Sequence, residues 1–227
     1  MIPPPENPLA VALDVSDLDE AERLARVLAP EVGLLKVGLE LIWAHGPQAV
    51  RRIAAHGPVF VDAKVHDIPT TAERASANIA RLGVRMFNVH ALGGPAMMRA
   101  AREGAERGAA AAGVEVPLVL AVTVLSSQAG EDLASPASLA WEAKESGLDG
   151  VVVSGEDVRD VRDACGEGFC LVVPAIRPGG TNGDDQVRVS TPQEASERGA
   201  DYLVVGRPIT GSSDPVGVAR AIVRAVR

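Results

Sequence analysis

From residue 9 onward, the chain alternates short apolar runs with amphipathic helical patterns. The apolar runs of strand length are Leu9–Val15, Leu34–Leu39, Val59–Val65, Val84–Ala91, Leu118–Leu125, Gly150–Ser154, Cys170–Ile176 and Tyr202–Gly206. Helical patterns lie between or after them, over residues 17–30, 40–56, 69–82, 95–112, 135–147, 156–165, 191–199 and from 214 to the end. One strand and one helix in about 28 residues is the length of a parallel βα repeat, and continuous apolar strands are typical of a sheet buried on both faces. We therefore predict an α/β fold: a single (β/α)8 TIM-barrel domain over residues 1–227.

The main alternative is a doubly wound open sheet. Such a sheet usually carries a glycine-rich turn after its first strand, but here that turn reads Asp14-Val15-Ser16-Asp17. The barrel is therefore favoured. Residues 1–8 are rich in proline and have no periodicity, so we expect them to form an extended leader outside the fold.

The charge balance restricts the kinds of partner. The chain has 22 Lys and Arg against 30 Asp and Glu, a net charge of −8, which argues against a general nucleic-acid or membrane surface. The apolar runs are of strand length and no signal peptide is visible, so we expect a cytoplasmic protein. Cys165 and Cys170 have no further ligands nearby in the sequence, and we interpret them as ordinary thiols.

Polar side chains occur at or just after the end of every predicted strand. They are Asp14, Lys36, Asp62, Lys64, Asn88, His90, Thr123, Ser126, Ser154, Arg177 and Arg207. In a barrel of this kind, functional groups gather at the carboxyl ends of the strands and in the loops that follow. The repetition over all eight strands predicts an active site there.

The third run carries the densest charge. Asp62 and Lys64 are two positions apart, so on a strand their side chains share one face, whereas Asp67 lies beyond the strand. Burying an unpaired charge costs several kcal/mol, so these residues are expected to pair around a reactive centre. Two alternatives remain: an internal ion-pair network without catalysis, and a divalent-metal site of Asp62 with His66 and His90. Lys36 and Lys64 would repel such a metal ion.

The last two loops indicate a phosphate site. Residues 176–186 are rich in glycine and long enough to fold over a ligand, and Arg207 follows the eighth run directly. Loops seven and eight are the usual phosphate site of these barrels. We expect a phosphorylated small-molecule substrate, although a solvated turn and a surface ion pair of Arg207 are alternatives.

Taken together, these motifs resemble the orotidine 5′-monophosphate decarboxylases, which belong to the ribulose-phosphate-binding type of barrel. The resemblance covers nearly the whole barrel. It rests on Leu13-Asp14, Lys36-Val37-Gly38, Asp62-Ala63-Lys64-Val65-His66-Asp67-Ile68-Pro69, Val122-Thr123-Val124-Leu125-Ser126-Ser127, Ala175-Ile176-Arg177-Pro178 and Val205-Gly206-Arg207-Pro208-Ile209-Thr210. One departure is that Ala63 and Val65 are smaller than the residues common around this lysine in some members.

The resemblance implies the following catalytic roles. Lys64 is the proton donor, Asp62 lies beside the carboxylate that leaves, and Lys36 orients Asp62 and touches the ribose. Asp67 resembles an aspartate that crosses a homodimer interface into the neighbouring site, accompanied by Thr71. No metal and no organic cofactor is implied.

The remaining implied residues bind the substrate. Asp14 is similar to the family's ribose-hydroxyl acceptor, and Ser126 to the residue that recognises the pyrimidine amide. Gln186, Gly206 and Arg207 resemble the phosphate grip, with Arg177 at its edge.

The predicted function is decarboxylation of orotidine 5′-monophosphate to uridine 5′-monophosphate, the last step of pyrimidine nucleotide synthesis, by a homodimer with shared active sites. The first alternative is a magnesium-dependent sugar-phosphate decarboxylase or aldolase of the same barrel group. The second is a barrel that binds a phosphorylated ligand without catalysis.

Overall fold

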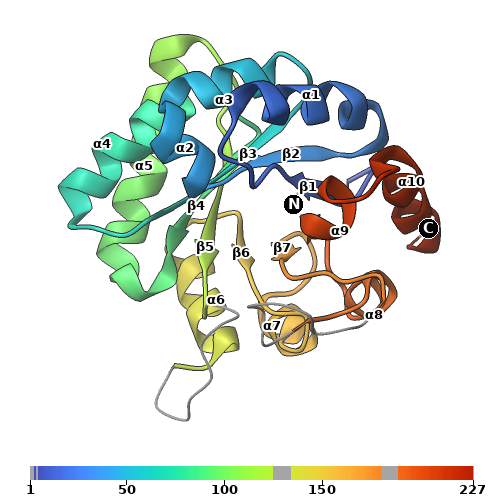
Figure 1. The fold of residues 1–227 in the computed structure, drawn as a ribbon. Coiled ribbons are helices and arrows are strands. Elements are labelled where there is room, and N and C mark those ends of the chain that lie inside the picture. The colour runs from blue at the N-terminus through green and yellow to red at the C-terminus, as the bar shows by residue number, and fades with distance from the viewer. Residues whose placement is uncertain (1–2, 4, 125–133, 180–188, 227) are drawn as a thin grey trace.

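The computed structural model describes residues 3, 5–124, 134–179 and 189–226. These residues form a closed barrel of eight parallel strands, each hydrogen-bonded to the next and β8 to β1 (Figure 1). The strands are β1 (Leu9–Ala12), β2 (Leu34–Val37), β3 (Val59–Val65), β4 (Met86–His90), β5 (Leu118–Val122), β6 (Gly150–Val152), β7 (Cys170–Val173) and β8 (Tyr202–Val205). The predicted (β/α)8 fold is confirmed.

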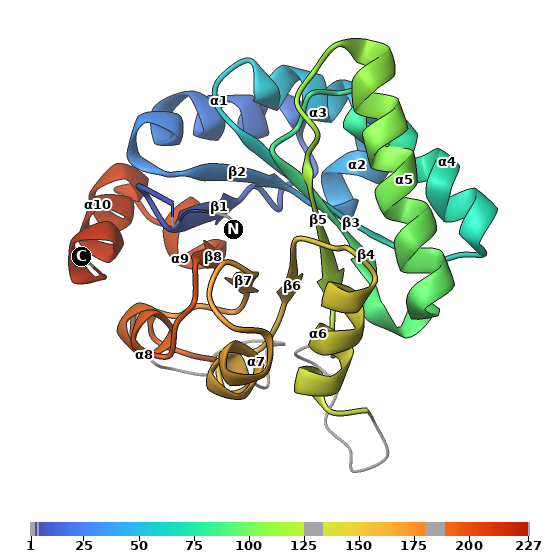
Figure 2. The same ribbon diagram turned by 180° about the vertical axis from the view of Figure 1, so that it is seen from behind.

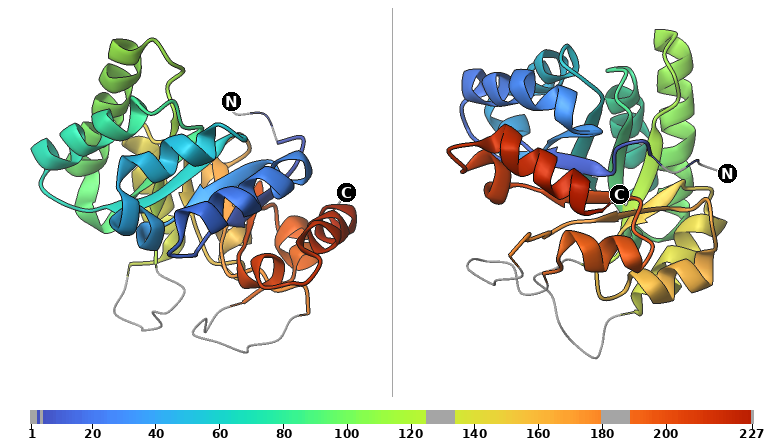
Figure 3. Two further views of the ribbon diagram at one scale, coloured as in Figure 1. Left: turned by 45° about the horizontal axis from the view of Figure 1, so that its top comes forward. Right: turned by 90° about the vertical axis from the view of Figure 1, so that its right-hand side faces the viewer.

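Helices surround the barrel on all sides (Figure 1). They are α1 (Leu18–Leu28), α2 (Leu39–His45), α3 (Pro47–Ala54), α4 (Pro69–Ala80), α5 (Gly94–Ala112), α6 (Pro136–Glu145), α7 (Val158–Cys165), α8 (Pro192–Glu197), α9 (Arg207–Thr210) and α10 (Pro215–Ala225), with short 3-10 turns η1 (Ala29–Glu31) and η2 (Ala91–Gly93). α10 packs against α1, so the last helix lies beside the first βα unit (Figure 3).

Alternation along the strands divides the apolar residues into two cores. Those that face the barrel interior form one buried cluster: Ala10, Ala12, Leu34, Phe60, Met86, Leu120, Cys170, Val172, Tyr202 and Val204. Their neighbours along each strand, such as Val11, Leu35 and Val61, pack outward against the helices. Lys36, Asp62 and Asn88 each stand two residues after an interior apolar residue, so the polar layer lies directly above the apolar one.

The segment 40–56, predicted as one helical pattern, is two helices. Gly46 separates α2 from α3 with a φ of 64°, a conformation that glycine adopts without steric cost, and Pro47 begins the second helix. The short helix α9 was not predicted. β1 ends at Ala12, earlier than its apolar run, so Asp14 lies in the loop above the barrel.

The predicted leader is attached to the barrel at its end. The Pro8 carbonyl accepts a hydrogen bond from the backbone of Leu203, and the Asn7 side chain donates to the carbonyl of Glu31. A Cβ atom at Gly33 would lie 2.1 Å from the Asn7 carbonyl oxygen, so glycine is needed for this close approach. The prediction that residues 1–8 lie outside the fold is therefore wrong for Asn7 and Pro8.

α4 and α5 lie side by side along much of their length (Figure 2). A Cβ atom at Gly104 would lie 2.1 Å from the Glu73 carbonyl oxygen, and one at Gly108 would lie 2.2 Å from that of Ala77. The two glycines therefore let the helix backbones touch.

Cys165 and Cys170 are buried free thiols, as predicted, and burial raises the pKa of both.

No helix among the described residues is both long and apolar enough to cross a membrane.

Candidate active site

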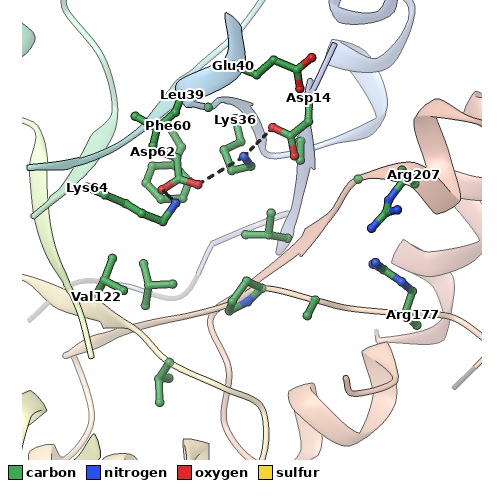
Figure 4. Close-up of a pocket in the computed structure, with 18 of the residues that line it drawn as sticks. Asp14, Lys36, Leu39, Glu40, Phe60, Asp62, Lys64, Val122, Arg177 and Arg207 are labelled. Atoms are coloured by element: carbon green, nitrogen blue, oxygen red, sulfur yellow. Dashed lines mark hydrogen bonds and ion pairs between the residues drawn. The ribbon is translucent and has the colours of Figure 1, made fainter. Parts of the chain in front are cut away.

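A cavity of about 620 Å³ opens at the carboxyl ends of the strands (Figure 4). Seven of the predicted site residues line it: Asp14, Lys36, Asp62, Lys64, Arg177, Gly206 and Arg207. They come from the ends of strands that are far apart in the sequence, and closure of the barrel brings them together.

Lys36 lies between two carboxylates. Its Nζ atom donates to Asp14 at 2.9 Å and to Asp62 at 3.3 Å, and only 7% of the residue is exposed. Burial opposes the positive charge, but the carboxylates of Asp62 and Asp14 outweigh burial and raise the pKa of Lys36. Lys36 is therefore a fixed cation at the floor of the cavity.

Asp62 is held by both of its oxygens. Oδ2 accepts from Lys36, while Oδ1 accepts from Lys64 Nζ at 2.6 Å and from Asn88 Nδ2 at 2.8 Å. Burial alone would raise the pKa of Asp62, but the charges of Lys36 and Lys64 and the hydrogen bonds from Lys64 and Asn88 lower it to about 2. The carboxylate stays ionised at neutral pH, although it is largely buried.

Lys64 extends into the cavity toward Asp62 (Figure 4). Its side chain is 29% exposed, so a ligand in the cavity can reach the ammonium. Its backbone has a φ of 48°, in the left-handed region that a residue with a Cβ rarely occupies. Ala175, with a φ of 59°, also lines the cavity, and such conformations cluster at functional sites.

Arg177 and Arg207 lie on the opposite side of the cavity from Lys64, with their guanidinium groups toward one another (Figure 4). Arg177 follows β7 and Arg207 begins α9. Two guanidinium groups that face one space can bind a phosphate through paired charge-assisted hydrogen bonds. The cavity thus has a Lys–Asp–Lys array at one end and an arginine pair at the other.

Comparison with known proteins identifies the family. The model of the orotidine 5′-phosphate decarboxylase / HUMPS family matches residues 7–222. The chain belongs to this family.

Relatives in the family support the assignment over nearly the full length. A protein of Moorella thermoacetica named orotidine 5′-phosphate decarboxylase is 47% identical, covering 96% of this chain and 91% of that protein. One of Syntrophotalea carbinolica with the same name is 49% identical, covering 95% and 93%. A solved structure of orotidine 5′-phosphate decarboxylase from Lactobacillus acidophilus has a TM-score of 0.84 and 34% identity, and covers 98% of this chain and all of that one.

Two predicted residues of this family member do not line the cavity of their own chain. Asp67 and Thr71 are exposed, in the loop after β3 and in the first turn of α4. The Asp67 carboxylate accepts the backbone N–H of Ile68 at 2.7 Å. Within one chain, the carboxylate that holds the Lys64 ammonium is that of Asp62. Ser126 and Gln186 lie outside the described residues.

The alternative metal site is not formed. The His66 and His90 rings are 5.4 Å apart, and burial, together with the charges of His66 and Lys64, lowers the pKa of His90. Among the residues that the structure describes, no three His, Cys, Asp or Glu side chains are grouped to hold a metal ion.

The sequence analysis did not identify several residues that line the cavity. Glu40 lines the cavity from the first turn of α2, in a segment predicted only as helix. Phe60 and Val204 also line it, and strand alternation would have identified them because they share the inward face with Asp62 and Ala12. Asn88 was identified as a strand-end residue but was not assigned to the site.

Proposed function

We propose that this protein decarboxylates orotidine 5′-monophosphate to uridine 5′-monophosphate without a metal or an organic cofactor. The observation that carries the proposal is the fixed Lys36–Asp62–Lys64 array across one cavity from Arg177 and Arg207. The names of the relatives at 47% and 49% identity support the same reaction.

The chemistry explains why a fixed cation is needed. When CO2 leaves the orotate ring, the electron pair of the broken C–C bond stays on the ring carbon in an sp² orbital outside the π-system. The ring cannot delocalise this pair, so a cation already in place must stabilise it. The Lys64 ammonium fills this role and then gives its proton to the same carbon, which leaves a neutral amine for solvent to reprotonate.

Asp62 and Lys36 prepare the Lys64 ammonium for this step. The 2.6 Å hydrogen bond from Lys64 to Asp62 fixes the ammonium before substrate binds. The substrate carboxylate lies next to Asp62 until it leaves as CO2. Lys36 in turn fixes Asp62 and, together with Asp14, binds the ribose hydroxyls.

The far end of the cavity binds the phosphate. Arg177, Arg207, Gly206 and Gln186 grip the phosphate, and Ser126 recognises the pyrimidine amide. Because the phosphate is remote from the bond that breaks, its binding energy is available to align the reacting groups.

We propose further that two copies of the chain form a homodimer with shared sites, in which Asp67 and Thr71 reach the neighbouring cavity. Both residues are exposed and neither lines the cavity of its own chain, which supports this arrangement. The reaction is the last step of pyrimidine nucleotide synthesis, and we place the protein in the cytoplasm.

The decisive experiment follows the absorbance of orotidine 5′-monophosphate as the sole substrate, with EDTA present. Turnover that EDTA leaves unchanged is the expected result. No turnover in this assay, together with magnesium-dependent turnover of a sugar phosphate in a parallel assay, would support the lyase alternative. Tight binding of uridine 5′-monophosphate by a protein that releases no CO2 would indicate a binding barrel without catalysis.

A further inference from the structure

β3 departs from regular pairing with β4 at the point where the charged residues lie. Val61 pairs with Phe87 and Val65 with Val89, so four residue steps on β3 stand opposite two on β4. β3 therefore carries two extra residues between these pairs. Because two is an even number, the alternation of faces is kept, and Val65 returns to the outward side.

The residue on β4 opposite this bulge is Asn88, which is 1% exposed. Asn88 Oδ1 accepts the backbone N–H of Lys64 at 2.7 Å, and Asn88 Nδ2 donates to Asp62 Oδ1 at 2.8 Å. The orientation of the amide is fixed by chemistry, since a backbone N–H can only donate and an ionised carboxylate can only accept. One side chain thus takes the place of the ladder bonds that the bulge removes.

These two hydrogen bonds stabilise two energetically costly features of the site, a left-handed backbone and a buried carboxylate. Lys64 has a left-handed backbone, which a residue with a Cβ keeps only where its surroundings hold it. Asp62 is a buried carboxylate whose Oδ1 also accepts from the Lys64 ammonium. Asn88 therefore joins the backbone of Lys64 to the carboxylate that binds the ammonium of the same residue.

We infer that Asn88 is a positioning residue that sets where the Lys64 ammonium lies relative to the reacting carbon. This inference rests on the proposed decarboxylation. Without the Asn88 amide, the Lys64 N–H loses its acceptor and Asp62 Oδ1 loses a donor, so the bulged backbone and the carboxylate that fixes the Lys64 ammonium are both free to shift. A displacement of about 1 Å in a reacting group can cost about 100-fold in rate.

The first test is the Asn88→Ala variant in full-length protein. We expect kcat for orotidine 5′-monophosphate to fall about 100-fold, with KM within a factor of about three, because the phosphate and ribose contacts remain. Asp201→Ala is the matched control. The Asp201 carboxylate likewise accepts a backbone N–H, that of Leu171 on β7, but Asp201 precedes β8 and does not line the cavity. Binding of uridine 5′-monophosphate and the melting temperature show whether each variant is folded.

The second test is Asn88→Asp, which keeps the shape of the side chain. An ionised carboxylate there still accepts the Lys64 N–H but repels Asp62, whereas a protonated one can donate to Asp62. The charged and titratable side chains around position 88 are Asp62 and Lys64 on β3, His90 on β4, Lys36 on β2 and His66 after β3. We expect the ratio of variant to wild-type kcat to rise as pH falls from about 8 to about 5, as the new carboxyl becomes protonated. This variant also serves if Asn88→Ala does not fold.

The outcomes separate the inference from the proposed function. If the wild-type protein does not release CO2 from orotidine 5′-monophosphate, the proposed function fails. If the wild-type protein is active but Asn88→Ala keeps kcat near the wild-type value, the inference alone is overturned. A pH-independent deficit in Asn88→Asp, matched by an equal loss in Asp201→Ala, would likewise reduce Asn88 to an ordinary structural role.

Discussion

The Lys64 ammonium donates to the Asp62 carboxylate at 2.6 Å, and the two residues are two positions apart on one strand. The contact is made where β3 bulges, with Lys64 in a left-handed backbone conformation. Local backbone geometry therefore brings the two charges together, and Lys36 and Asn88 hold the carboxylate from neighbouring strands.

Removal of the Lys64 ammonium should abolish decarboxylation. We expect Lys64→Ala to lower kcat by at least about 1,000-fold, because both the stabilising charge and the proton donor are lost. Binding of uridine 5′-monophosphate and the circular dichroism spectrum should stay close to wild type. The chain has three lysines, and the third, Lys144 on α6, bonds the Cys165 carbonyl away from the cavity, so Lys144→Ala is the matched control. Near-normal turnover by Lys64→Ala would contradict the assigned role.

A shared active site predicts complementation between inactive subunits. Asp67→Ala and Lys64→Ala proteins should each be inactive, and their mixture should regain activity after subunit exchange. With random exchange half of the dimers are hybrid and half of their sites are whole, so we expect about a quarter of wild-type activity. Each variant incubated alone is the control. If mixtures shown by mass spectrometry to contain hybrids stay inactive, the sites are not shared.

The ionised state of Asp62 predicts a loss of stability in acid. The pKa of this carboxyl is lowered from its ordinary value of 3.8 to about 2. Its contribution to the free energy of unfolding, about 2 kcal/mol, is therefore fully present above pH 3.8 and lost as pH falls through 2. Urea unfolding measured from about pH 5 downward should show a shallower pH dependence for Asp62→Asn than for wild type. Parallel curves for the two proteins would show that Asp62 has an ordinary pKa when folded.

The contact between α4 and α5 predicts a steric limit at Gly108. A methyl group there would lie 2.2 Å from the Ala77 carbonyl oxygen, and the backbone cannot move aside without separating the helices. Alanine favours the helix by about 1 kcal/mol, but overpacking costs about 1–3 kcal/mol, so Gly108→Ala should be destabilising on balance. Chemical denaturation measures the change. Glu103→Ala, at an exposed position of the same helix, should change stability by less than about 0.5 kcal/mol, and an equal loss there would exclude the steric explanation.

The sequence alone was sufficient to predict the barrel and most of the polar residues that line its cavity. The strand period of two and the βα repeat are local properties of the chain, so the inward positions of Lys36 and Asp62 and the position of Arg207 directly after the eighth strand could be predicted. The break at Gly46 was not predicted, because the apolar pattern continues on both sides of the Gly-Pro pair that marks it.

Only the tertiary structure decided which polar groups meet. Asn88 and Lys64 are 24 positions apart, and the bulge that brings the Asn88 amide to the Lys64 backbone arises from the pairing of two strands. The left-handed conformation of Lys64 is likewise invisible in its sequence, because lysine has no local preference for it. Alternation along one strand fixes the side on which a residue lies, whereas the distance between charges depends on how separate strands pair, and that pairing is set by closure of the whole barrel.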